Sequence, residues 1–211
     1  MRRAGVIGVV LLSLLTGCVG AAQAWTPGPI ITESVTPPPV TPGTVTPSPT
    51  VAAPAKPTVP DSAGALDVSS YESAHFASPT GRIWCALAGD WALCHFPRDM
   101  NTSKVPKSSK VCPGAGLDVT GVSVGAKAAE YFCSGGAEAL PQTDGTYTDW
   151  WRSTGYPKVK YEGQDMATLP YGSKLVHGRF LCLSEQAGVL CGNTTTGAGF
   201  RVSREGVTFI K

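Results

Sequence analysis

A repeated cysteine spacing constrains the fold of this chain more than any other feature. The segments 81–87 and 178–184 both begin G-R-x-x-C, and in both a second cysteine follows after eight intervening residues. If Cys85 pairs with Cys94, only Gly89-Asp90 remains at the tip, and Gly-Asp is a favoured two-residue hairpin loop. The two cysteines then fall on a non-hydrogen-bonded pair, whose Cα atoms lie about 4.5 Å apart, within disulfide reach. We therefore expect two equivalent β-hairpins, each closed by a disulfide; in the second, a bulge at Gly188 would shift the register.

The first of the seven cysteines has a different setting. Cys18 follows two arginines, a 12-residue apolar run and the sequence Leu15-Thr16-Gly17. This order resembles the lipobox of bacterial lipoproteins, in which the signal is cut after Gly17 and the thiol of Cys18 is diacylglycerated. The apolar run is too short for a membrane span, which needs about 20 residues. We therefore expect residues 1–17 to be a lipoprotein signal peptide.

This signal predicts where the protein is found. Cleavage before Cys18 would leave a protein anchored to the cell membrane by its N-terminal lipid, facing the extracytoplasmic side. An ordinary signal peptide, cut after Ala22-Gln23-Ala24, is the alternative. Removal of residues 1–17 also takes away Arg2 and Arg3, which leaves 15 basic and 15 acidic residues. A neutral chain has no basic field to attract nucleic acid, so we expect no nucleic-acid partner.

Six cysteines remain once Cys18 is assigned to the lipid. An even number outside the cytoplasm predicts three disulfides. With the two hairpin pairs taken, Cys112 and Cys133 pair by elimination, although six cysteines allow 15 connectivities. A metal site is not expected, since there is no C-x-x-C pair and no histidine at zinc-ligand spacing. The six are Cys85, Cys94, Cys112, Cys133, Cys182 and Cys191.

The chain divides into a linker and one domain. Between Thr26 and Pro60 there are 11 prolines and 8 threonines in 35 residues. Such a segment has almost nothing to bury, so we expect residues 18–60 to form a disordered Pro/Thr-rich stalk. Residues 61–211 have the length of a single domain, which we expect to be a disulfide-bonded β domain.

Short strand signals separated by turn residues run through residues 61–211. Their spacing predicts an all-β fold, a small antiparallel sandwich or barrel built from hairpins. Helical periodicity is weak, with at most a single turn at Lys127–Tyr131. At the C-terminus, Arg204-Glu205-Gly206 is expected to be a three-residue hairpin loop. The expected strands are Gly81–Ala88, Trp91–Phe96, Leu117–Val124, Ala128–Cys133, Leu175–Leu183, Val189–Gly192, Phe200–Ser203 and Val207–Ile210.

Four segments together resemble an uncharacterised family of actinobacterial secreted proteins and lipoproteins. They are 76–85 (F-A-S-P-T-G-R-I-W-C), 169–172 (L-P-Y-G), 188–200 (G-V-L-C-G-N-T-T-T-G-A-G-F) and Ser203-Arg204. The family's segments read S-P-S-G-N-I-x-C, L-P-Y-G and C-x-N-x-x-T-G-x-G-F followed by S-R, so Arg82 and Ala198 depart from the usual Asn and His. The resemblance implies an envelope protein with paired cysteines and implies no activity.

Candidate catalytic residues are few. Gly121-Val122-Ser123-Val124-Gly125 matches G-x-S-x-G, but a nucleophile elbow needs a strand–turn–helix context, whereas alternating valines favour a strand. The three histidines, His75, His95 and His177, form no metal-binding or catalytic motif. The sequence thus predicts no catalytic constellation, no cofactor and no metal.

An aromatic cluster marks the segment Gln142–Gln164. Exposed aromatic side chains are typical anchors of a protein or glycan contact, but these could instead cover an open face of the sandwich. The sequence does not separate the two interpretations. The candidate binding residues are Tyr147, Trp150, Trp151, Tyr156 and Tyr161.

These observations favour a non-enzymatic function. We expect a lipid-anchored module whose extracytoplasmic β domain binds an envelope protein or a glycan. One alternative is an envelope inhibitor or a phage superinfection-exclusion lipoprotein. Another is an envelope hydrolase, which would need Ser123 or a carboxylate pair to converge in a pocket.

Overall fold

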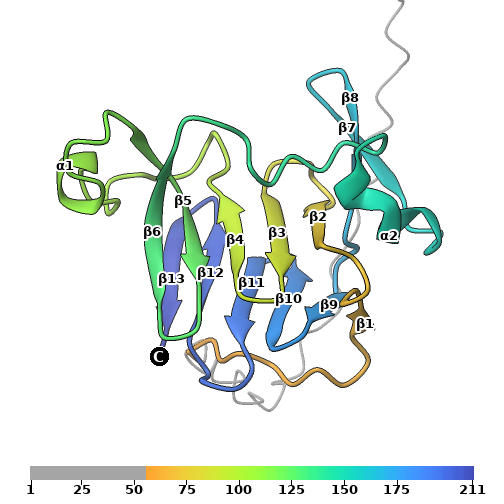
Figure 1. Ribbon diagram of the computed structural model, residues 1–211. Coiled ribbons are helices and arrows are strands. Elements are labelled where there is room, and N and C mark those ends of the chain that lie inside the picture. The colour runs from red at the N-terminus through yellow and green to blue at the C-terminus, as the bar shows by residue number, and fades with distance from the viewer. Residues whose placement is uncertain (1–55) are drawn as a thin grey trace, which may run out of the picture. The chain divides into compact units, whose positions relative to one another are not determined.

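Two β-sheets packed face to face form the body of the described part of the chain, beside a separate two-stranded sheet (Figure 1). The computed structural model describes residues 56–211. The expected signal peptide, Gly17, Cys18 and the stalk up to residue 55 lie outside the described residues. The long strands pair antiparallel, and the sheets do not close into a barrel. The predicted all-β fold is confirmed in its sandwich form.

The five-stranded sheet contains the first predicted hairpin. Cys85 pairs with Cys94, Leu87 pairs with Ala92, and the Ala88 amide donates to the carbonyl of Trp91 at 2.9 Å. This is the predicted register, with Gly89-Asp90 as the turn. The strands follow one another in chain order: β2 (Ser73–Ala77), β3 (Trp84–Ala88), β4 (Ala92–His95), β5 (Asp118–Val124) and β6 (Ala129–Ser134).

The six-stranded sheet contains the second hairpin. Cys182 pairs with Cys191 and Glu185 with Gly188, so no bulge shifts this register. The first strand is a two-residue edge strand, parallel to its neighbour, and the others are antiparallel. In spatial order they are β1 (Leu66–Asp67), β9 (Lys174–His177), β10 (Phe180–Glu185), β11 (Gly188–Asn193), β12 (Gly199–Ser203) and β13 (Gly206–Ile210).

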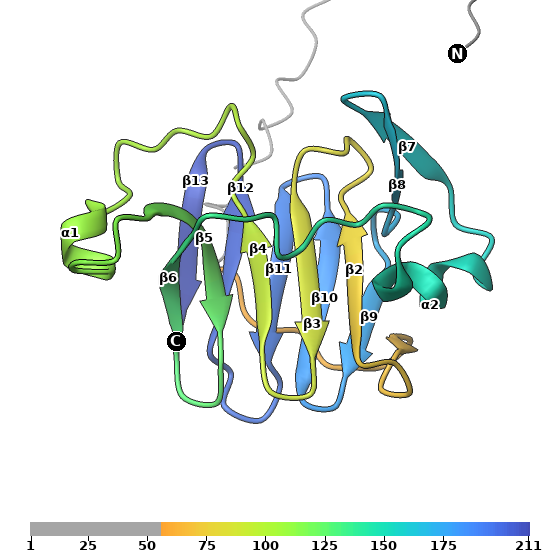
Figure 2. The same ribbon diagram turned by 45° about the horizontal axis from the view of Figure 1, so that its top comes forward.

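The two copies of the G-R-x-x-C pattern occupy equivalent places in the two sheets. Gly81 and Gly178 each stand in the turn before the first cysteine strand, with φ of 75° and 59°. Only glycine adopts such angles without steric cost, which explains why both copies begin with it. In both views the β3–β4 and β10–β11 hairpins lie in opposite layers (Figures 1 and 2).

Three local predictions need correction. Lys127–Tyr131 does not form a helical turn: it leads into β6, where Glu130 pairs with Ser123. The expected strand Leu175–Leu183 is two strands, because the chain turns at Gly178-Arg179. The last hairpin has a two-residue turn, Arg204-Glu205, since Ser203 pairs directly with Gly206.

The hairpin disulfides meet in the core between the sheets. Cys85–Cys94 and Cys182–Cys191 both have Cα–Cα distances of 4.1 Å, and all four cysteines are fully buried. Around them pack large apolar side chains from both layers, among them Phe76, Leu87, Val122, Phe180 and Phe200. Cys112 and Cys133 form the third bridge, which ties the loop containing α1 (Ser108–Val111) to β6. All three predicted disulfides are confirmed.

The aromatic segment Gln142–Gln164 lies beside β2, at one side of the sandwich (Figures 1 and 2). Trp150 is only 1% exposed, and its indole N–H donates to the carbonyl of His75 at 3.1 Å. The segment thus covers a face that β2 would otherwise open to water. It contains η1 (Thr146–Thr148), α2 (Asp149–Arg152) and β7 (Lys158–Tyr161), which pairs with β8 (Gln164–Ala167).

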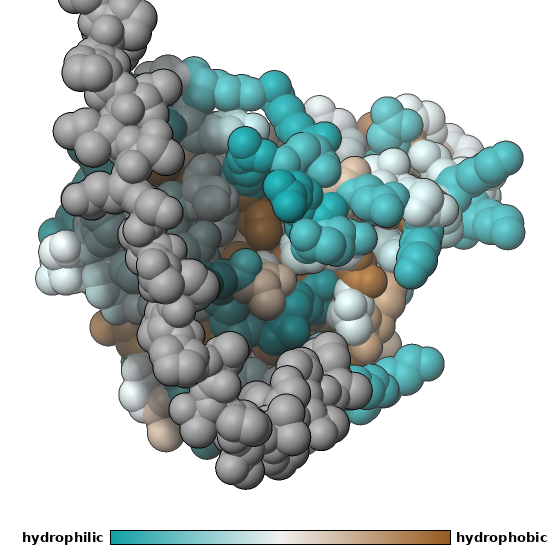
Figure 3. All heavy atoms as spheres, turned by 180° about the vertical axis from the view of Figure 1, so that it is seen from behind, coloured by the Kyte–Doolittle hydropathy of each residue, from teal (hydrophilic) through white to brown (hydrophobic). Residues whose placement is uncertain are grey.

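Val59, near the start of the described residues, packs against the outer face of the six-stranded sheet. Gly192 and Gly199 pair across β11 and β12, and a Cβ added at Gly192 would lie 2.3 Å from Cγ2 of Val59. Val59 therefore sits in a groove that the two glycines leave open. Packed structure thus begins before residue 61, although Val59 belongs by composition to the stalk. Where the surface is visible on this side of the molecule, hydrophilic residues predominate and hydrophobic ones show between them (Figure 3).

Within residues 56–211, no helix has both the length and the apolar character needed to cross a bilayer.

Candidate functional site

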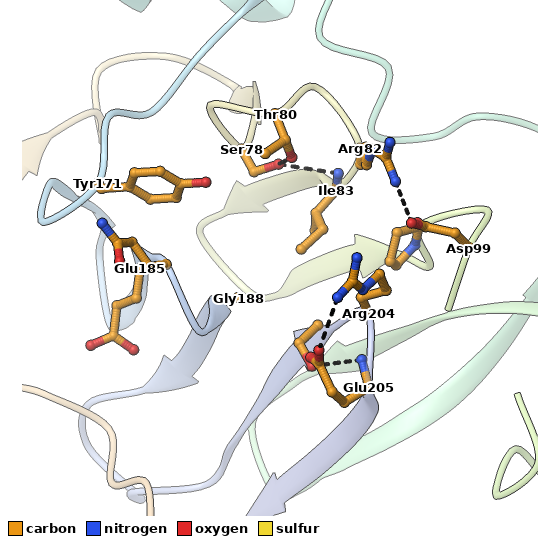
Figure 4. Close-up of a pocket in the computed structure, with 13 residues that line it drawn as sticks. Ser78, Thr80, Arg82, Ile83, Asp99, Tyr171, Glu185, Gly188, Arg204 and Glu205 are labelled. Atoms are coloured by element: carbon orange, nitrogen blue, oxygen red, sulfur yellow. Dashed lines mark hydrogen bonds and ion pairs between the residues drawn. The ribbon is translucent and has the colours of Figure 1, made fainter. Parts of the chain in front are cut away.

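One hollow of the described domain is lined by arginines, carboxylates and hydroxyls (Figure 4). Its volume is about 370 Å³, within the range of small-molecule sites. We call it the arginine–carboxylate cleft. Its lining residues are Ser78, Thr80, Arg82, Ile83, Pro97, Asp99, Tyr171, Glu185, Gln186, Gly188, Ser203, Arg204 and Glu205.

Turns between strands build this cleft. The β2–β3 turn is held by the Gly81 amide, which donates to the Ser78 carbonyl at 2.8 Å, and by the 3.0 Å contact between the Ser78 and Thr80 hydroxyls. The β10–β11 turn ends at Gly188, where an added Cβ would lie 2.3 Å from the Val202 carbonyl oxygen. Only a glycine allows these two segments to approach so closely. The cleft is therefore held by the hydrogen bonds and close packing of the sandwich.

Each arginine at the cleft has a carboxylate partner. Arg82 pairs with Asp99, and both side chains remain partly exposed. The guanidinium of Arg204 lies 3.9 Å from Glu205. Just beyond the lining, Arg201 pairs with Glu185 at 2.5 Å. The cleft thus presents donors and acceptors side by side with little unbalanced charge.

Hydroxyl groups and one aromatic ring complete the cleft. Tyr171 is 42% exposed, and its hydroxyl points into the cleft (Figure 4). Ile83 supplies an apolar patch between the polar groups. Serine, threonine and tyrosine hydroxyls both donate and accept, arginine only donates, and carboxylates only accept. Such a surface can bind a ligand whose own groups donate and accept at neighbouring positions.

A second polar cluster joins His95, Glu138 and Ser134. His95 Nε2 lies 3.0 Å from Glu138 Oε2, and the Ser134 hydroxyl donates to Glu138 Oε1. Burial lowers the pKa of His95, and the neighbouring Glu138 only partly offsets this effect. Burial raises the pKa of Glu138, but the hydrogen bond from Ser134 and nearby His95 bring it below its usual value.

The three side chains of this cluster do not lie in the order that nucleophilic catalysis needs. A serine is activated when an imidazole takes its proton and a carboxylate orients that imidazole. Here the carboxylate of Glu138 stands between Ser134 and His95. Ser134 Oγ also accepts a hydrogen bond from the Gly136 amide at 2.9 Å. The arrangement fastens the segment after β6 to β4.

Ser123 and the other histidines have structural surroundings. Ser123 lies within β5, paired with both Leu93 and Glu130, where no nucleophile elbow is present. His75 contacts the Leu140 carbonyl through Nδ1 at 3.3 Å. His177 Nε2 lies 2.7 Å from the Tyr71 carbonyl.

Close sulfur atoms in the core do not make a metal centre. The Sγ atoms of Cys85, Cys94 and Cys191 all lie within 4.8 Å of one another. Metals bind cysteine as the thiolate, and in the structure each of these sulfurs belongs to a disulfide.

The structure does not gather the five predicted aromatic residues into one exposed patch. Trp150 is buried, and Trp151 and Tyr156 pack partly buried against the core. Tyr147 is 44% exposed and stacks on the His75 ring, with centroids 4.5 Å apart. Tyr161 lies edge-on to Trp84 at 5.9 Å. Most of the cluster therefore covers the sandwich, and Trp150 offers no surface to a partner.

Comparison with protein-family models, curated proteins and solved structures finds no match to this chain.

The sequence did not predict the arginine–carboxylate cleft, although most of the residues that line it lie in segments that the sequence analysis had singled out. The four segments that carry the resemblance contribute eight of its lining residues. They are far apart in the chain and meet because the β2–β3, β10–β11 and β12–β13 turns and the β8–β9 connection all border this cleft. The eight residues are Ser78, Thr80, Arg82, Ile83, Tyr171, Gly188, Ser203 and Arg204.

Proposed function

We propose that this chain is a lipid-anchored, extracytoplasmic lipoprotein whose β domain is a non-enzymatic binding module for a glycan of the cell envelope. The arginine–carboxylate cleft is the proposed binding site. The observation that carries the proposal is the pairing of each cleft arginine with a carboxylate beside hydroxyls and the exposed Tyr171 ring.

The chemistry of a sugar matches this lining. Each sugar hydroxyl both donates and accepts, so vicinal hydroxyls need donors and acceptors at adjacent positions. The Arg82–Asp99 and Arg204–Glu205 pairs offer that arrangement. The apolar C–H face of a sugar ring also suits an aromatic surface such as Tyr171.

The charge pattern favours a glycan over an anionic ligand. Sites for phosphate or nucleic acid present cations free to pair with the ligand. At this cleft the cations Arg82 and Arg204 face Asp99 and Glu205, and Glu185 adds a further carboxylate. A phosphorylated or nucleic-acid ligand would meet these acidic groups.

The location rests on the sequence. The lipobox ending at Cys18 and the Pro/Thr-rich stalk would hold the domain away from a membrane. The three disulfides support an oxidising compartment. A glycan of the envelope would lie within reach of such a protein.

The test is co-sedimentation with purified, detergent-washed bacterial cell-wall sacculi. We expect the full chain to sediment with the sacculi, and Arg82→Gln/Asp99→Asn to weaken retention at least tenfold. The matched control is Arg152→Gln/Asp149→Asn on α2. That pair has similar side-chain exposure, 52% and 45% against 52% and 38%, and lies outside the cleft. Its variant should sediment like the wild type.

Three outcomes would overturn the proposal. The first is a wild-type chain that stays in the supernatant, and the second is a cleft variant that sediments as well as the wild type. The third is loss of binding when the sacculi are treated with protease, which would indicate a protein partner.

The anchor has its own test. Cys18→Ala should release the protein from the membrane fraction and leave the disulfide-bonded domain folded. Retention of this variant in the membrane would contradict the lipobox.

A further inference from the structure

A second cleft adjoins the first and has a different lining. Its volume is about 320 Å³, and the aromatic side chains of Trp84, Phe96 and Tyr161 contribute to it. We call it the aromatic cleft. It shares Arg82 and Pro97 with the arginine–carboxylate cleft, so the two hollows are neighbours along one surface.

We propose that the two clefts are consecutive subsites of one groove, which binds a chain of at least two sugar residues across Arg82. This inference rests on the proposed function and extends it from a single sugar to an oligosaccharide. Each cleft alone is near the lower end of the roughly 300–1,000 Å³ found for small-molecule sites. Taken together, they fall in the middle of that range.

The aromatic cleft suits the apolar face of a sugar. Trp84 and Tyr161 meet edge to face, with ring centroids 5.9 Å apart, and both remain partly exposed. The indole N–H of Trp84 already donates to the Gly81 carbonyl at 2.7 Å. What Trp84 offers a ligand is therefore its ring, which can pack against sugar C–H groups.

The charges around the aromatic cleft are also paired. Arg98 pairs with Glu162. Arg82 pairs with Asp99 at the boundary. The aromatic cleft thus presents paired donors and acceptors like its neighbour, which argues for one polyhydroxylated ligand running through both.

The aromatic cleft is held firmly in place. Cβ and Cδ2 of Tyr161 would lie 3.0 and 3.3 Å from a Cβ at Gly81, so β7 packs directly against the β2–β3 turn. That turn also carries Arg82 and Thr80 of the first cleft. A single short turn therefore fixes the position of the two subsites relative to each other.

The experiment measures how affinity depends on chain length. The probes are peptide-free glycan fragments prepared enzymatically from sacculi and separated into strands of one, two and three sugar residues. For the wild-type chain we expect the dissociation constant to fall at least tenfold from the shortest to the longest strand. Tyr171→Ala, confined to the first cleft, should weaken binding of all lengths.

Substitutions in the aromatic cleft should weaken the binding of the long strands only. Trp84→Ala should weaken the longest strand about tenfold, enough to remove most of the gain with length, and leave the shortest unchanged. Tyr161→Leu is a second variant with a milder change in packing. Near-ultraviolet circular dichroism reports whether each variant keeps the native core.

The outcomes separate this inference from the proposed function. Binding of short strands without any gain in length, or equal weakening of all lengths by Trp84→Ala and Tyr161→Leu, would overturn the two-subsite groove alone. Failure of every strand to bind the wild-type chain would overturn both.

Discussion

Sγ of Cys94 lies 3.8 Å from Sγ of Cys191, although the two residues belong to different sheets. The disulfides that close the two hairpins are thus in contact at the centre of the sandwich. Each bridge links residues nine apart, and each is packed against its counterpart. The bridges therefore act both as local cross-links and as part of the core.

This contact predicts that removing the two hairpin disulfides is not additive. The chain-entropy model assigns about 3 kcal/mol to each of the three loops. Alanine at both Cys85 and Cys94 should lower the free energy of unfolding by at least that much. Removing both hairpin bridges should cost less than the sum, by at least about 0.5 kcal/mol, because their mutual contact is lost in each single removal.

The third bridge is the control for this cycle. Cys112–Cys133 lies outside the core cluster, with a Cα–Cα distance of 6.3 Å. Its removal should add to that of either hairpin bridge within about 0.3–0.5 kcal/mol. Denaturant unfolding of the single and combined variants measures both quantities. If the losses in free energy of unfolding add equally well for all three pairs of bridges, the contact between the sulfur atoms of the two hairpin disulfides contributes nothing to stability.

Gly192→Ala should destabilise the domain by about 1–3 kcal/mol, because the new methyl group would overlap Val59. Val59→Ala in the same chain should recover part of the loss by making room. Gly125→Ala is the matched control, since no heavy atom lies within 4 Å of an added Cβ there. Thermal unfolding of the four chains is the measurement; no difference between the two glycine variants would contradict the groove.

Stability should fall as the pH drops below about 6.5. Burial lowers the pKa of His75 and of His95 from their usual 6.5, with hydrogen bonding to Leu140 and proximity to Glu138 as opposing effects. Below pH 6.5 the unfolded chain then binds more protons than the folded one, which favours unfolding. The loss begins at 6.5 and continues down to the folded-state pKa values.

Melting temperatures measured between pH 7.5 and 5 test this expectation. His75→Gln and His95→Gln each remove one titrating group. Each should therefore make the melting temperature depend less steeply on pH, whatever it does to the melting temperature at pH 7.5. A double variant with the full wild-type slope would show that other groups control the pH dependence.

Trp150 and Tyr147 should respond very differently to truncation. Trp150→Ala empties a buried site and leaves the His75 carbonyl without its donor, so we expect a loss of about 3–5 kcal/mol. Tyr147→Ala removes a half-exposed ring that stacks on His75, at a cost below about 1 kcal/mol. Chemical denaturation distinguishes the two; similar losses would mean that Trp150 is not part of the core.

Local signals explain which parts of the fold were predictable. Gly89-Asp90 and the cysteine spacing determine the first hairpin because turn and register depend on adjacent residues. In contrast, β2 (Ser73–Ala77) is buried at all five positions, so it lacks the alternation that reveals a half-buried strand. Its second face is covered by the aromatic segment with Trp150, a contact between distant parts of the chain.

The arginine–carboxylate cleft was not predictable for a related reason. Its residues come from turns of both sheets, and their meeting depends on how the sheets stack. No local pattern encodes that Arg82 pairs with Asp99 or that Tyr171 lies across from them. The aromatic cluster was the stronger signal in the sequence. Buried and exposed aromatic side chains, however, give a segment the same composition, so the sequence could not separate a covering role from a binding role.

The Val59 contact also has a mechanical consequence. The edge strand β1 (Leu66–Asp67) has only two residues, so a pull from the N-terminal side could peel it from β9 one hydrogen bond at a time. Before the tension reaches β1, it meets Val59 in the glycine groove and Asp61, held 3.5 Å from Lys174. The pulling force is thereby transferred to the middle of the six-stranded sheet, where several strands must separate from one another at the same time.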